Sequence, residues 1–299
     1  MASFFDEISA NKIRSILLMI VFGAIFAGIE YLLIVWLGGG ILALALGIGV
    51  IVLYAAFTYF YGSKIVLKMS NAQVADKNQY KQLYEIISEL TIASQLPMPT
   101  VYIINDPNPN AFATGKNRKN ASIAVTSGLL SMMNKNELEG VLAHEVSHIA
   151  NNDIQFMLYA IVFAGAIGIL SAFIRNIFLF GGISGGNRNN GGIFIIIGLV
   201  VGILAPIFAL LLKLAISRKR EYMADANGAR ITRAPDYLAS ALKKIEGYEK
   251  KPSAMPVRHA NEITSSLYFE NPISKRSFMN LFSTHPPIEE RINRLEHMY

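Results

Sequence analysis

The sequence predicts a mainly α-helical membrane protein, with four transmembrane helices and a small α/β domain that contains a short sheet. Three observations lead to this fold class. The 299-residue chain is 53% hydrophobic and only 16% charged, and its mean hydropathy is +0.38. Long apolar runs account for such an excess better than one oversized core does. Between the runs lie two polar stretches that contain short strand-like segments and a capped helix.

Four apolar segments are candidates to cross a hydrocarbon core of about 30 Å. They cover residues 16–37, 41–61, 157–174 and 193–216. The first is too long for a signal-peptide core and lacks a small-residue cleavage pattern, so we expect it to be retained. The chain is thus divided into four parts: a transmembrane hairpin (1–61), a first polar part (62–156), a second hairpin (157–216) and a second polar part (217–299).

Basic residues predict the orientation. Lys and Arg number eight in 62–156 and fourteen in 217–299, whereas the short turn 38–40 has none. By the positive-inside rule, both polar parts and both termini lie in the cytoplasm. The net charge of +6 comes largely from residues near the apolar runs, which indicates a lipid bilayer as partner and argues against nucleic acid. The chain has no Cys, so thiolate metal sites are excluded.

A helix that begins after Asn134 carries a metal motif. Asn134 followed by Glu137 is typical of a capping box. His144 and His148 are four residues apart, so they share one helix face and can bind one tetrahedral zinc. Glu145 follows the first histidine, and its carboxylate can act as general base toward a water at the metal. The alternative is a chance match on an exposed helix.

A catalytic zinc needs a third protein ligand and an open position. No further histidine follows His148 at the spacing of known zinc motifs, so the ligand must come from farther along the chain. Glu221 and Asp225 share a helix face, and one could bind metal while the other orients a ligand histidine. They could equally be ordinary acids beside the basic run 218–220.

Two short strands are predicted at residues 100–104 (TVYII) and 121–126 (ASIAVT), separated by the turn formers of 105–110. A strand with a free edge can take a peptide by β-augmentation. From its residues alone, 121–126 is better interpreted as a plain core strand. Near the C-terminus, Pro287 can start a helix that bears Ile288 and Ile292.

Four motifs together resemble HtpX-type membrane proteases, which are bacterial relatives of the type I CAAX prenyl protease. They are NAFATG (110–115), HEVSHIANND (144–153), EYMADANGA (221–229) and STHPPIEERI (283–292). The resemblance covers nearly the whole chain. It implies one zinc ion per chain, bound by His144, His148 and Glu221, with Glu145 as the general base.

The resemblance also implies a substrate-binding edge strand at 121–126 and a histidine near the metal that stabilises the oxyanion. The residues implied for substrate contact are Asn110, Ala121, Ile123 and Val125. From its own sequence context, His285 is better interpreted as a capping or packed histidine. By the resemblance, we expect His285 as the oxyanion residue, Asp225 behind a ligand histidine, and Arg291 paired with a nearby acid.

His148 lies about nine residues before the third apolar segment, and Glu221 about five after the fourth, so we expect the metal near the cytoplasmic membrane face. These expectations describe a zinc endopeptidase of the bacterial cytoplasmic membrane that cleaves membrane or misfolded proteins. The resemblance implies a role in membrane protein quality control under stress. The alternatives are a catalytically silent adaptor, which would need ligand or base residues replaced, and a transporter, which leaves the polar half unexplained.

Overall fold

The computed structural model describes residues 41–159, 218–249 and 286–298, together with six separate helical positions between 13 and 28. The long helix α2 (Ile41–Met69) leads into the domain. The predicted apolar segment 41–61 lies within this helix. The predicted segments 16–37, 157–174 and 193–216 fall almost entirely outside the described residues. Within the described stretches, no helix is both long and apolar enough to cross a membrane.

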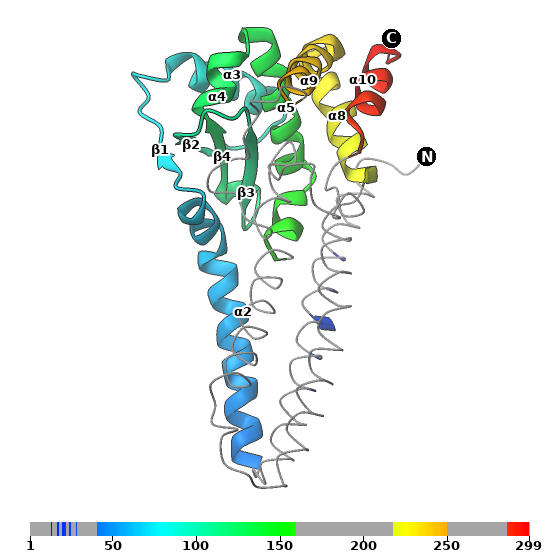
Figure 1. The fold of residues 1–299 in the computed structure, drawn as a ribbon. Helices are drawn as coiled ribbons and strands as arrows, with labels where there is room; N and C mark the ends of the chain where they lie inside the picture. The colour runs from blue at the N-terminus through cyan, green and yellow to red at the C-terminus, as the bar shows by residue number, and fades with distance from the viewer. Residues whose placement is uncertain are drawn as a thin grey trace, which may run out of the picture.

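The domain contains a four-stranded sheet and seven α-helical elements in the described stretches (Figure 1). The strands are β1 (Gln73–Val74), β2 (Thr100–Ile104), β3 (Ala111–Gly115) and β4 (Ala121–Thr126). The helices are α3 (Lys81–Ala93), α4 (Ser127–Met132), α5 (Lys135–Ala150), a helical stretch at 153–159, α8 (Arg218–Thr232), α9 (Pro235–Glu249) and α10 (Ile288–Glu296). The predicted strands 100–104 and 121–126 and the predicted helices after Asn134 and Pro287 are confirmed.

The order of strands in the sheet is β1-β2-β4-β3. β2 and β4 run parallel, with Thr100 opposite Ser122, whereas β3 and β4 are antiparallel, with Ala111 opposite Val125. β4 is therefore an interior strand that is hydrogen-bonded on both sides. The expectation of a substrate-binding edge strand at 121–126 is wrong, because the main-chain groups of β4 are already used by its two neighbours.

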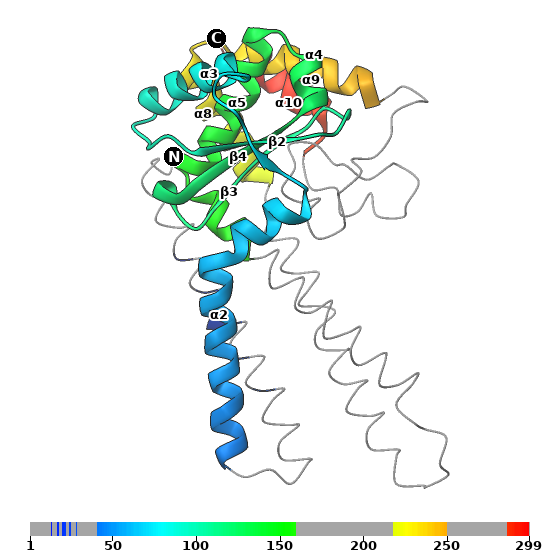
Figure 2. The same cartoon turned by 90° about the vertical axis from the view of Figure 1, so that its left-hand side faces the viewer.

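Side chains alternate between two cores on the two faces of the sheet, as the pleat requires. One face of β4 contributes Ala121, Ile123 and Val125 to a large core shared with α3, α5, α9 and α10. The opposite face, with Phe112 and Ala124, packs against the C-terminal end of α2. In Figure 2 the sheet accordingly lies between α2 below and the helices α3 and α9 above. Ala121, Ile123 and Val125 are thus core residues, which corrects their expected role in contacting substrate.

α5 lies at the centre of the helical layer, in contact with α3, α8, α9 and β3. It is buried along most of its length, and the buried residues include the polar side chains of His144, Glu145 and His148. Two glycines allow this packing. A Cβ at Gly140 would lie 2.5 Å from the backbone nitrogen of Leu238 on α9, and a Cβ at Gly228 on α8 would lie 3.2 Å from the backbone nitrogen of His144. Close backbone approach thus brings α8 alongside the histidines.

Candidate metal centre

The two histidines lie on the same face of α5, as predicted from their spacing. The helix begins with a capping box, in which Asn134 accepts a hydrogen bond from the backbone N–H of Glu137 and the Glu137 carboxylate accepts one from Asn134. His144 and His148 are both buried, and their Nε2 atoms are 3.1 Å apart. Their Nε2 atoms thus face the same point in the interior.

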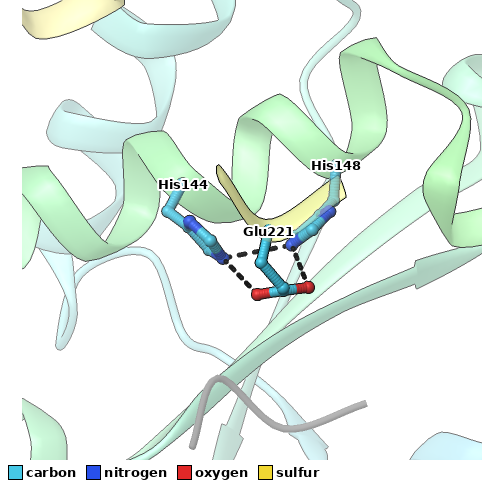
Figure 3. Close-up of side chains that lie close together, drawn as sticks. All are labelled: His144, His148 and Glu221. Atoms are coloured by element: carbon cyan, nitrogen blue, oxygen red, sulfur yellow. Dashed lines mark hydrogen bonds and ion pairs between the residues drawn. The ribbon is translucent and has the colours of Figure 1, made fainter. Parts of the chain in front are cut away.

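Glu221 approaches this point from the first turn of α8 (Figure 3). One carboxylate oxygen lies 3.6 Å from Nε2 of His144, and the other lies 3.7 Å from Nε2 of His148. Zinc–ligand bonds of about 2.0–2.2 Å in a tetrahedron place neighbouring ligand atoms about 3.3 Å apart. The separations of 3.1, 3.6 and 3.7 Å lie near that value, the last two to different oxygens of Glu221. One ligand atom from each of the three residues lies within 4.8 Å of the other two, so the group could hold a single metal ion.

Both histidines are held from behind by carboxylates. Nδ1 of His144 is 2.9 Å from Asp225, and Nδ1 of His148 donates to Asp153 at 3.0 Å. A carboxylate on Nδ1 fixes the tautomer that leaves the Nε2 lone pair for a metal. The arrangement matches what was expected of Asp225. It also includes Asp153, a residue for which the sequence analysis predicted no role. The signal in the sequence was an acid five residues after the second histidine.

The backbone after α5 explains how Asp153 reaches His148. α5 ends at Ala150, and Asn152 adopts a φ of 58°, in the left-handed region that Asn tolerates better than most residues. Residues 151–152 form this turn, and residues 153–159 then form a new helical stretch. Asp153 is completely buried at its start, where the positive end of the helix dipole also favours a carboxylate.

Arg291 supports the site from the C-terminal helix α10. Its guanidinium donates two hydrogen bonds to Asp225, at 2.9 and 2.7 Å, and it is completely buried. The expectation that Arg291 pairs with an acid near the metal centre is thus matched by this geometry. Because the pair is bidentate, it fixes the Asp225 carboxylate in position as well as balancing its charge.

These contacts perturb the ionisation of the pair His144 and Asp225. Burial alone would raise the pKa of Asp225, but the charge of Arg291 and hydrogen bonds with His144 and Arg291 outweigh it and lower the pKa to about 2. Burial alone would lower the pKa of His144, but hydrogen bonds with Asp225 and Glu221 outweigh it and raise the pKa to about 9. Without a metal, both ring nitrogens of His144 therefore carry a proton at neutral pH. A metal that binds Nε2 has to displace the proton on that nitrogen.

The other expected site residues have mixed outcomes. Glu145 lies on α5 beside the first histidine and is 2% exposed. Asn110 is buried just before β3, with its backbone N–H bonded to the Thr126 hydroxyl at 2.8 Å. Their roles toward substrate stay predictions. His285 lies outside the described residues.

The comparisons with known proteins agree with this geometry. Residues 77–299 match the model of peptidase family M48. The chain is 44% identical to a protease HtpX homolog of Caldanaerobacter subterraneus over 97% of this chain and 96% of that protein. It is 42% identical to a protease HtpX homolog of Leuconostoc citreum, over 98% and 99% of the two chains.

Among solved structures, the crystal structure of S. mikatae Ste24p gives a TM-score of 0.49 at 18% identity, covering 94% of this chain and 62% of that one. The assignment rests on the sequence matches, which extend over nearly the whole of this chain and of the two relatives. They show that the chain is a metalloprotease and that it belongs to peptidase family M48.

Proposed function

We propose that this metalloprotease is a zinc-dependent endopeptidase anchored in the bacterial cytoplasmic membrane, with its catalytic domain in the cytoplasm. The observation that carries the zinc assignment is the donor set of two imidazoles and one carboxylate, each histidine backed by an acid. Nitrogen and oxygen donors at tetrahedral spacing suit zinc, whereas magnesium and calcium prefer six or more oxygens.

In this proposal His144, His148 and Glu221 hold the zinc, which when bound would polarise the scissile carbonyl and activate water. The Glu145 carboxylate accepts a proton from the attacking water and passes it to the nitrogen of the leaving amine. Asp225 and Asp153 keep Nδ1 of each histidine protonated. His285 is proposed to stabilise the developing oxyanion.

The substrates we propose are polypeptides close to the bilayer, in the form of loops of membrane proteins or misfolded chains. Asn110 precedes β3, the strand at one end of the sheet, and β3 contacts α5. Asn110 is therefore suitably placed to position a substrate main chain near the histidines. A role in membrane protein quality control under stress fits this substrate class. A silent adaptor is not favoured, because the proposed base and the three donors are all retained.

The test compares the full chain, purified in detergent with zinc, with Glu145→Gln. We expect cleavage of unfolded casein to fall by about 10²-fold or more, because the proton acceptor is lost, while bound zinc stays near one per chain. Glu139→Gln, the same change on the same helix away from the site, should leave cleavage unchanged. Equal activity of Glu145→Gln and the unmodified chain would exclude the proposed base.

A further inference from the structure

The surface of α2 changes character along the helix. Toward its N-terminal end, exposed side chains are aliphatic, and Leu53 is 70% exposed. About one turn later come half-exposed aromatic residues: Phe57 and Tyr61, whose rings stack at 5.2 Å, and Phe60, which is 57% exposed. Lys64 follows, with its ammonium 5.9 Å from the Tyr61 ring. This order from aliphatic to aromatic to basic is the one found where a helix leaves a bilayer.

A second segment of the domain adds to the same surface. Lys116, in the loop after β3, lies over two rings of α2, 5.4 Å from the centroid of Tyr59 and 5.0 Å from that of Phe60. The sheet is thus joined to α2 at the level of the aromatic residues. We call this surface the collar and define it by its members, which are Phe57, Tyr59, Phe60, Tyr61, Lys64 and Lys116.

The charge around the collar has one sign. Residues 55–72 and 111–126, which supply and flank it, contain five basic residues and no Asp or Glu. Of these, Arg118 donates to the carbonyl of Ala150. The other four of these basic residues are lysines, and none of them has a carboxylate partner among the described residues. They are Lys64, Lys68, Lys116 and Lys119. Elsewhere on the domain Lys81, Lys243 and Lys244 pair with acids.

We propose that the collar binds the headgroups of anionic phospholipids at the cytoplasmic surface of the bilayer, an inference that rests on the proposed membrane anchoring. Aromatic rings favour the headgroup level, and ammonium groups beside them attract lipid phosphates. Because Lys116 belongs to the loop between β3 and β4, a lipid bound here also holds the sheet, and with it the metal centre, at a fixed height above the membrane.

The test is a lipid titration of the full chain, purified in neutral detergent and freed of native lipid. Phosphatidylglycerol or phosphatidylcholine is added, and bound lipid is counted by native mass spectrometry. We expect the unmodified chain to prefer phosphatidylglycerol, and Lys64→Gln/Lys116→Gln to lose roughly fivefold in affinity per lysine. The matched control is Lys77→Gln/Lys81→Gln, in which Lys77 also lies over a tyrosine ring, 5.6 Å from that of Tyr84.

Four results would overturn the proposal: equal binding of the two lipids, an unchanged affinity in the collar variant, an equal loss in the control, or binding of the free glycerophosphoglycerol headgroup as tightly as the whole lipid. The last would indicate a soluble phosphate ligand instead of a lipid. A separate experiment tests the membrane anchoring itself, by washing membranes with alkaline carbonate. Release of the chain into the wash would contradict the anchoring. A chain that stays in the membrane but shows no lipid preference contradicts the collar alone.

Discussion

At the scale of single residues, the metal centre depends on side chains that never touch the metal. His144 is held by Asp225, and Asp225 is held in turn by Arg291 from the last helix. His148 depends on Asp153, which is completely buried. Such outer carboxylates orient the imidazole ring and raise its basicity as a ligand.

Asp153 provides a prediction at this scale. Asp153→Ala should weaken zinc binding by about 10–100-fold, because His148 loses the acceptor that fixes its tautomer. Asp153→Asn should recover part of the loss, since the amide oxygen can still accept from Nδ1. Competition with a chromophoric chelator measures the affinity. Glu85→Ala, which removes a surface acid, is the control, and an Asp153→Ala chain that binds zinc normally would show that His148 needs no such support.

At the scale of elements, α5 is positioned by its contacts with α8 and α9. Glu137 joins two of these elements. It caps α5 and also accepts hydrogen bonds from Ser240 at 2.9 Å and Lys244 at 2.6 Å on α9. Burial alone would raise the pKa of Glu137, but the hydrogen bonds from Lys244, Asn134 and Ser240 outweigh it, and the pKa lies below its ordinary value.

This shift has a defined consequence for stability. Because the folded-state pKa is lowered, the carboxylate stabilises the fold above the unfolded-state pKa of about 4.3, and the contribution is lost as the pH falls through the folded value. Glu137→Gln should therefore lower the free energy of unfolding by about 1–2 kcal/mol at pH 7. The difference should shrink as the pH falls below about 4.3 and then through the lowered folded-state pKa of Glu137, as followed by urea unfolding. A difference independent of pH would contradict the role of the charge.

The close approach of α5 and α9 gives a second prediction for the elements. Gly140→Ala should destabilise the fold by about 1–3 kcal/mol, because the new methyl group meets the backbone of Leu238. Gly247→Ala, on α9 itself, has nothing within 4 Å and should stabilise by up to about 1 kcal/mol through helix propensity. Thermal unfolding of both variants measures the contrast, and similar melting temperatures would exclude a tight crossing at Gly140.

At the scale of the whole molecule, the metal centre joins parts of the chain that are far apart in sequence. The histidines come from α5, the carboxylate from α8, and the supporting arginine from α10, with residues 160–217 and 250–285 between them. A ligand that binds only the folded state stabilises it by an amount set by its concentration and affinity.

Metal removal should therefore lower the stability of the domain. With free zinc at about a thousandfold above its dissociation constant, the stabilisation is about 4 kcal/mol. We expect chelation to lower the melting temperature of the unmodified chain by several degrees, and to have little effect on Glu221→Gln, which lacks one ligand. The same shift in both chains would show that the chelator acts elsewhere than at this centre.

The sequence by itself determined the helix that bears His144 and His148, the capping box and two of the four strands. Those features depend on local spacing, because residues four apart share a helix face and β-branched runs favour strands. Only the tertiary structure decided the interior position of β4, the existence of β3 in the weakly strand-forming stretch AFATG, and the meeting of Asp153 with His148. These depend on hydrogen bonds between distant strands and on one left-handed turn, and local periodicity carries no information about either.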